Sequence, residues 1–287
     1  MRTLSLLAGA LLGCGDKDAA DTADHTANYL IEGNAAVTVT TQTVSIDEDC
    51  EMSLSLYTPA EHSGGPLLIL AHGFVRSQIN MAGWASHLAS WGVQVTTPDL
   101  CHSSFTDADH AANADELRAL NDAIGAGPVI YAGQSAGGLS ALIAAAEDDD
   151  ALAGIGLDAT DSDGLGVERV SGAAVPLLGL VGEPSDCNAD SNGIAIYSAA
   201  AQATAFRVVE SDHCDFEDET DVLCTALCQG DNTQFSEEEI HEVILGMLTS
   251  AVVDLAGAGS GRAEWWTPGG TTHDALIESG AILPLAP

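Results

Sequence analysis

The residues with the clearest chemical potential form a short motif around Ser135. The stretch Gly133-Gln134-Ser135-Ala136-Gly137 has the pattern G-x-S-x-G. It follows the apolar stretch 129–132 and opens an alanine-rich stretch, 136–147, so it predicts a strand, a sharp turn and a helix. Glycines are needed on both sides because side chains there would collide across the turn. Such a turn projects the serine hydroxyl as a potential nucleophile.

Strands and helices alternate along most of the chain that must position this motif. Short apolar or β-branched stretches predict strands at 36–46, 52–57, 66–71, 92–97, 128–132, 152–157, 175–181 and 205–209. Apolar residues at helical spacing predict helices at 81–88, 117–124, 136–147, 194–203 and 236–252. This alternation predicts an α/β fold with a mostly parallel sheet flanked by helices. We expect a single domain, 34–287, that ends in an irregular Gly-rich tail after residue 253.

These landmarks resemble the α/β-hydrolase family over about residues 50–250. Besides the serine motif, Ala71-His72-Gly73-Phe74 directly follows the Leu-Leu-Ile-Leu strand. In that family this loop supplies one backbone amide of the oxyanion hole, and the residue after the nucleophile supplies the other. The resemblance therefore implies an oxyanion hole made by the N–H groups of Phe74 and Ala136, which would stabilise the transition state of acyl transfer.

A base must lie within hydrogen-bonding distance of the serine, because a serine hydroxyl is a weak nucleophile at neutral pH. The family carries its catalytic histidine in the loop after the last strand. Of the nine histidines, that position singles out His213, which follows the predicted strand 205–209. His273, in the Gly-rich tail, is the alternative.

The acid that would orient this histidine is harder to assign in so acidic a chain. The stretch from Gly154 to Gly164 resembles the Gly-Leu-Asp-Pro-Val-Asp-Gly stretch of chlorophyllases, with Ala-Thr in place of Pro-Val. In chlorophyllases and in plasma platelet-activating-factor acetylhydrolase, the aspartate that ends this strand completes the triad, which implies Asp158 here. Other family members carry the acid one strand later, which leaves Glu183 and Asp186 as alternatives. Within the same stretch, two further aspartates are weaker alternatives, Asp161 and Asp163.

The predicted function is hydrolysis of carboxylic esters through an acyl-enzyme. Asp158 lies 17 residues before the next predicted strand, which leaves no room for a helical cap domain. We therefore expect an open cleft, as in cutinase-like and chlorophyllase-like members, for a small-molecule, lipid or polymeric ester. No cofactor and no metal are implied. A peptidase or amidase with the same triad, and a non-catalytic surface lipoprotein that uses the fold as a binding scaffold, remain as alternatives.

The charge balance excludes some partners. The 287 residues include 43 acidic and 7 basic side chains, a formal net charge of −36. A polyanion cannot gain affinity by neutralising phosphates, so we expect no nucleic-acid partner. Anionic membrane surfaces would also repel it. The hydrophobic fraction of 46% argues against intrinsic disorder, and we expect a folded monomer.

The N-terminus predicts export. Arg2 precedes a short apolar run that ends at Cys14, and the run is too short to span a bilayer. Leu11-Leu12-Gly13-Cys14 resembles the bacterial lipobox, whose cysteine is acylated. The resemblance implies a signal peptide, 1–13, and a cell-envelope lipoprotein that touches the membrane only through Cys14. The Asp-, Ala- and Thr-rich residues 14–33 predict an acidic flexible tether.

The remaining six cysteines predict three disulfides, because an exported chain folds in an oxidising environment. Cys50 and Cys101 lie far along the chain from the other four, which favours pairing them with each other. The other four are Cys187, Cys214, Cys224 and Cys228, whose pairing the sequence leaves open.

Overall fold

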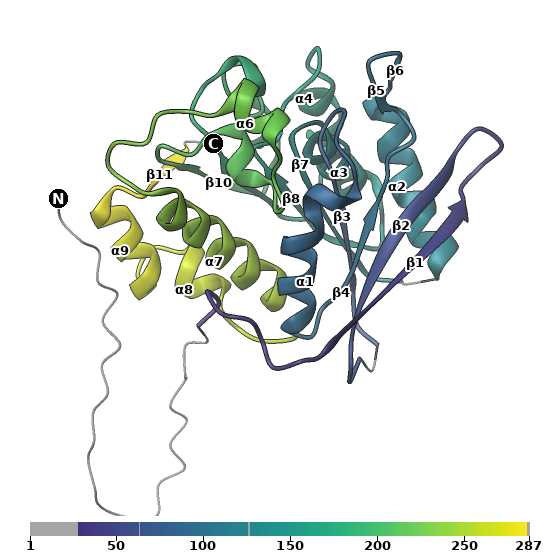
Figure 1. Cartoon of the computed structure of the whole chain (residues 1–287), viewed down its shortest axis with the longest axis horizontal. Helices are drawn as coiled ribbons and strands as arrows, with labels where there is room; N and C mark the ends of the chain where they lie inside the picture. The colour runs from purple at the N-terminus through teal and green to yellow at the C-terminus, as the bar shows by residue number, and fades with distance from the viewer. Residues whose placement is uncertain (1–27, 63, 126, 286–287) are drawn as a thin grey trace, which may run out of the picture.

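The computed structural model describes residues 28–62, 64–125 and 127–285 (Figure 1). The expected signal peptide, the anchor Cys14 and the expected tether up to residue 27 lie outside the described residues. The last residues of that tether, 28–33, contact the domain through some of their side chains, while Ile31 is exposed. The buried Tyr29 packs on Trp91 with ring centroids 4.8 Å apart, and its carbonyl lies 3.0 Å from Nε2 of His87.

A nine-stranded sheet forms the middle layer, in the order β1-β2-β4-β3-β7-β8-β9-β10-β11. The strands from β4 to β10 in this order run parallel, and antiparallel strands complete both ends. The prediction of an α/β fold with a mostly parallel sheet is therefore confirmed. The strands of the sheet are β1 Val37–Ser45, β2 Glu51–Pro59, β3 Leu67–Ala71, β4 Gln94–Pro98, β7 Val129–Gln134, β8 Ala151–Leu157, β9 Leu177–Val181, β10 Ala203–Val208 and β11 Ile282–Leu285.

Helices cover both faces of the sheet, and each face has its own apolar core (Figure 1). In β3, Leu68 and Leu70 join one core while Leu67 and Ile69 join the other, because successive side chains of a strand point to opposite faces. The helices of one face are α1 Ala82–Ser90, α7 Glu237–Leu255, α8 Arg262–Trp266 and α9 Thr271–Ser279. Those of the other are α2 His110–Ile124, α3 Ser135–Glu147, α4 Leu165–Val170 and α5 Ile194–Ala199. No helix among the described residues is long and apolar enough to cross a membrane.

The C-terminal segment is more regular than the sequence suggests. Instead of an irregular tail it forms α8, α9 and the strand β11, which pairs antiparallel with β10. The buried Trp266 and Ile282 anchor this segment to the core. The predicted helix 194–203 was also too long, since it ends at Ala199 and Ala203 already belongs to β10.

The loops at the carboxyl ends of the parallel strands contain further short elements that the sequence did not reveal. The loop after β3 contains η1 Gln78–Met81, and the loop after β4 contains a small hairpin, β5 Ser103–Ser104 and β6 Asp107–Ala108. Two other loops contain η2 Asp186–Asn188 and η3 His213–Phe216, and η3 is followed by α6 Val222–Cys228. All of these elements follow the carboxyl ends of the parallel strands, the same edge of the sheet where Ser135 follows β7.

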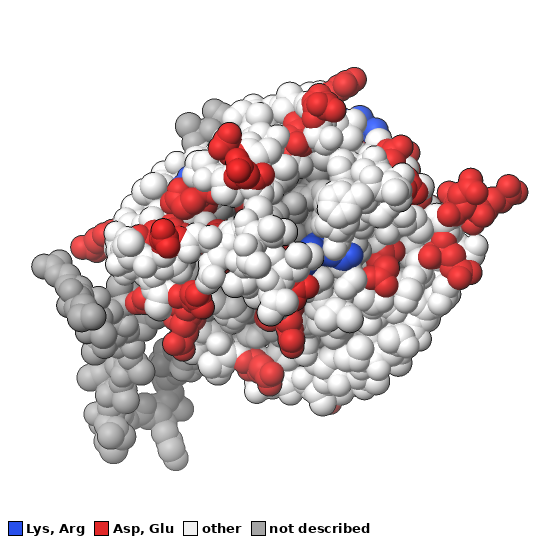
Figure 2. All heavy atoms as spheres, turned by 45° about the horizontal axis from the view of Figure 1, so that its top comes forward, with Lys and Arg blue, Asp and Glu red and all other residues white. Residues whose placement is uncertain are grey.

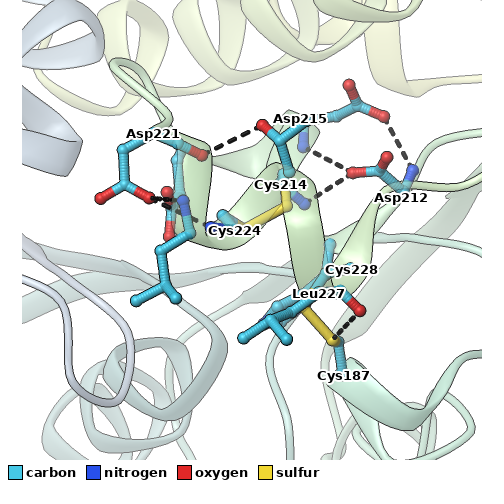
Figure 3. Close-up of a disulfide and its surroundings, with 12 residues drawn as sticks. Cys187, Asp212, Cys214, Asp215, Asp221, Cys224, Leu227 and Cys228 are labelled. Carbon is cyan, nitrogen blue, oxygen red and sulfur yellow. Dashed lines mark hydrogen bonds between the residues drawn. A yellow bond between two sulfur atoms is a disulfide. The ribbon is translucent and has the colours of Figure 1, made fainter.

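Three disulfides join the described cysteines. The predicted pair Cys50–Cys101 is confirmed. The other two are Cys187–Cys228 and Cys214–Cys224, so that α6 is covalently linked at both of its cysteines (Figure 3).

Candidate active site

Ser135 occupies a tight turn between β7 and α3. Its φ of 55° lies in the left-handed region that non-glycine residues seldom adopt. This conformation costs about 1–3 kcal/mol and persists only where the surrounding structure enforces it. The flanking glycines allow the backbone to close around it. A Cβ on Gly133 would lie 2.5 Å from the carbonyl oxygen of Gly137, and one on Gly137 would lie 2.1 Å from that of His72. Larger side chains at either position would therefore force the turn open.

The loop after β3 brings the predicted oxyanion-hole residues to this turn. His72 is buried, and its Nδ1 lies 2.8 Å from the carbonyl oxygen of Gly73 while its Nε2 accepts the N–H of Leu100 at 3.0 Å. Both ring nitrogens therefore hold the loop in place, and burial lowers the pKa of this histidine. Within the described residues, the backbone N–H groups of Phe74 and Ala136 donate no hydrogen bond. Both amides are thus free to donate to a ligand.

His213 and Asp158 form a buried pair beside the turn, where His213 contacts Gln134, the residue before Ser135. Asp158 follows β8 with a φ of 46°, and His213 opens η3 after β10. The Nδ1 atom of His213 lies 2.6 Å from Oδ2 of the fully buried Asp158. The same carboxylate accepts the N–H of Gly182 at 2.9 Å and the side-chain amide of Asn188 at 3.1 Å. These donors satisfy the hydrogen-bonding capacity of the buried carboxylate and fix its orientation toward the ring.

The other acids proposed from the sequence lie elsewhere. Glu183 pairs with Arg207 at 3.3 Å, and Asp186 is exposed in η2. Asp161 accepts the N–H groups of Ser162 and Gly166 at 2.8 and 2.7 Å and so fixes the turn before α4. Asp163 is exposed. Within the described part of the chain, Asp158 is the one acid of this group that contacts His213.

The alternative histidine, His273, lies in α9, away from this pair. Its Nδ1 atom lies 2.8 Å from Oδ1 of the neighbouring Asp274, and its ring packs edge-on against Phe206 with centroids 5.7 Å apart. These contacts account for its burial without a catalytic role.

Gln134 is a component of the site that the sequence did not reveal. Its Nε2 atom lies 3.1 Å from Nε2 of His213 and 3.3 Å from the carbonyl oxygen of the same residue. A carbonyl oxygen only accepts, so the amide nitrogen must face this side and donate to the ring nitrogen as well. No hydrogen bond joins Ser135 to His213 in the described residues. The amide therefore occupies the nitrogen that would take the serine proton.

The second unforeseen component is a buried ion pair between the loops that carry the two halves of the site. Arg76, in the loop after β3, forms two hydrogen bonds of 2.6 Å with Glu217, four residues after His213. It also lies 3.1 Å from Asp221, the N-cap residue that precedes α6. Burial raises the pKa of Glu217, even though Arg76 opposes that shift. The pair fixes the spacing between two loops. One is the loop after β3, which we call the oxyanion loop for its predicted role, and the other is the loop after β10 that carries His213, which we call the histidine loop.

The histidine loop is further held by capping and by a disulfide (Figure 3). Asp212 precedes η3 and accepts the N–H groups of Cys214 and Asp215 at 2.7 and 3.2 Å. Cys214, next to His213, is bonded to Cys224 of α6. Burial, together with the nearby Asp212 carboxylate, raises the pKa of Asp215 to about 7.

Two groups of side chains in the described residues have ligand atoms close enough for a metal ion. One contains Cys214, Cys224 and Cys228, and the other Cys50, Cys101 and Glu116. All five cysteines are in disulfides, so they offer no thiolate, which is the form that binds metals.

Comparison with known proteins does not identify a family for this arrangement. No protein-family model matches the chain, and no curated protein is significantly similar to it in sequence.

Proposed function

We propose that this protein is a serine hydrolase that cleaves carboxylic esters through an acyl-enzyme. The observation that carries the proposal is the buried His213–Asp158 pair, with 2.6 Å between Nδ1 and Oδ2, beside the strained turn that presents Ser135. Strain at a non-glycine residue is retained where function requires it, and an imidazole oriented by a buried carboxylate is a suitable base.

The chemistry follows from the roles of these groups. Ser135 Oγ attacks the ester carbonyl carbon while its proton passes to Nε2 of His213. The C–O bond to the alcohol then breaks, and His213 returns the proton to the alcohol oxygen. A water molecule then attacks the acyl-enzyme carbonyl in the same way, with His213 as the base. The carboxylic acid is released and Ser135 is restored. Asp158 accepts the Nδ1–H throughout and stabilises the imidazolium, and the amides of Phe74 and Ala136 bind the oxyanion.

The surroundings support an open site on an exported protein. The link between Asp158 and β9 contains the six-residue helix α4 and no cap domain. Three disulfides fit an oxidising compartment. With the lipobox resemblance around Cys14, they support a lipid-anchored protein of the cell envelope.

The proposal is tested on the full chain with p-nitrophenyl butyrate and a fluorophosphonate probe. Ser135→Ala should abolish both turnover and labelling. Asp158→Asn should reduce kcat by on the order of 10⁴, because the wrong tautomer of His213 would then be favoured. Glu183→Gln, a matched acid-to-amide change one strand away, should leave kcat within about twofold.

Two results would contradict this assignment. Labelling of Ser135→Ala at the wild-type rate would exclude Ser135 as the nucleophile. Faster cleavage of p-nitroanilides than of the matching p-nitrophenyl esters would favour the amidase alternative on the same triad.

A further inference from the structure

Exposed apolar side chains gather at the edge of the sheet where Ser135 lies. Nine large hydrophobic side chains of the described residues are exposed. Three of them, Ile31, Val39 and Leu283, lie elsewhere. The other six follow the carboxyl ends of β3, β4 and β10, and we call them the apolar rim: Val75, Ile79, Phe105, Val222, Leu223 and Leu227. Figure 1 shows two of its carriers, α6 and the β5–β6 hairpin, on the same side of the molecule.

Direct contacts join the segments that carry the apolar rim. The ring of Phe105 packs edge-on against Phe74, with centroids 5.3 Å apart. The N–H of Val75 donates to the carbonyl of Ser103 at 2.8 Å, which ties the oxyanion loop to the hairpin. On the other side, the contact of Arg76 with Asp221, the N-cap residue of α6, ties the same loop to that helix. The rim therefore surrounds the loop that carries the proposed oxyanion hole.

Helix α6 is built with its apolar side chains outward. Val222 and Leu227 are 86% and 72% exposed, and Cys224 is the one buried residue of the helix. A surface helix ordinarily buries its apolar face against the core. Here two disulfides, from Cys224 and Cys228, hold the helix in place. The disulfides thus fix α6 without the packing that its apolar side chains would otherwise supply. Those exposed apolar side chains can therefore contact an external partner.

Charge restricts what the apolar rim can contact. Asp218, Glu219 and Asp221 directly precede α6, and the nearby Arg76 is already paired with two carboxylates. Figure 2 shows acidic side chains across this part of the surface and few basic ones. A second copy of this chain, with its own net charge of −36, would be repelled, and so would an anionic lipid surface. Charge therefore excludes an anionic partner, and the exposed aliphatic and aromatic side chains of the rim favour an apolar one.

We propose that the apolar rim docks the protein onto the surface of an uncharged, water-insoluble ester, so that substrate enters the site from an aggregated phase. The proposal rests on the proposed esterase function and specifies its substrate class. Docking places the oxyanion loop at the boundary between water and the apolar phase. Soluble esters reach Ser135 without using the rim.

The docking step is tested apart from catalysis and from the proposed lipid anchor by flotation of the full chain with triolein droplets, in a Ser135→Ala/Cys14→Ser background. Val222→Ser/Leu227→Ser removes two rim side chains. Val39→Ser/Leu283→Ser removes two exposed apolar side chains, 51% and 49% exposed, on the outer strands β1 and β11. The rim variant should bind droplets at least tenfold more weakly, and the control variant should bind like its parent. With Ser135 restored, the rim variant should hydrolyse soluble p-nitrophenyl acetate at the unmodified rate.

Several outcomes would overturn the docking proposal. The first is that the parent does not bind droplets, and the second is that the rim and control variants bind them equally. The third is that the parent binds anionic phosphatidylglycerol vesicles as strongly as it binds droplets. A parent dimer that the rim variant dissociates would show that the rim joins two copies. Droplet binding without ester hydrolysis by the wild type would reject the esterase function alone. Hydrolysis of soluble esters without droplet binding would reject the docking alone.

Discussion

Replacing Gln134 should make Ser135 more reactive, because its side-chain amide contacts the His213 nitrogen that takes the serine proton in the proposed mechanism. The contact between the two Nε2 atoms is 3.1 Å long, and it must break before His213 can accept the serine proton. Methionine has a similar length and no donor. It also fits a site where the side-chain oxygen of Gln134 is buried without a partner, so the change removes no hydrogen bond from that oxygen.

The magnitude follows from the worth of one neutral hydrogen bond. Such a bond contributes about 0.5–1.5 kcal/mol net, and about 1.4 kcal/mol corresponds to a factor of ten. Gln134→Met should therefore raise the second-order rate of fluorophosphonate labelling roughly two- to tenfold. Gln202→Met is the matched control, since its side chain is exposed and contacts the carbonyl of Ala174.

The assay is stopped-flow or gel-based labelling of the full chain, with the melting temperature measured on the same samples. A rate that falls tenfold at an unchanged melting temperature would refute the reasoning. It would mean that Gln134 orients His213 for catalysis and does not compete with Ser135. An unchanged labelling rate would show that breaking the contact between Gln134 and His213 costs no measurable free energy.

Two further predictions concern the loops around the site. Arg76→Lys should lower the free energy of unfolding by about 1–3 kcal/mol in denaturant titrations, because one ammonium cannot replace a bidentate guanidinium on the buried Glu217. Arg262→Lys, at a partly exposed pair 3.4 Å from Asp254, should change it by less than about 0.5 kcal/mol, and equal losses would contradict the argument. Asp215→Asn should stabilise the protein more at pH 8.5 than at pH 5. The raised pKa of Asp215, about 7 against 3.8, means that its contribution to stability is complete below pH 3.8 and is lost as the pH rises through 7. Equal gains in melting temperature at both pH values would contradict this.

The parts of the candidate site that depend on residues close together in the chain could be predicted from the sequence. The turn at Ser135 needs only a strand, two glycines and a helix within a few residues. The order of the parallel strands then places His213 and the candidate acids at one edge. Choosing among those acids needed three-dimensional contacts, because Asp158 is distinguished by donors from Gly182 and Asn188, 24 and 30 residues away.

The unpredicted parts are contacts between residues far apart in the chain. Gln134 and His213 are separated by 79 residues, and Arg76 and Glu217 by 141. No local pattern of residue types encodes such pairs. The strand β11 was missed for a related reason. It has four residues, including Pro284, and becomes a strand only because β10 offers it a free edge.

The disulfides around α6 have a consequence for how the chain matures. Six cysteines allow 15 pairings. In a chain that emerges N-terminus first, Cys50 and Cys101 are both available before Cys187 appears, and their closure leaves four cysteines with three pairings.

The remaining pairings must be chosen among cysteines that lie close together in space. The sulfur atoms of Cys214, Cys224 and Cys228 lie within 4.8 Å of one another in the folded protein. A swapped bond between Cys214 and Cys228 would join sulfur atoms that are already close, and it would rearrange the segment that directly follows His213. The yield of active protein should therefore depend on the isomerisation of these disulfides.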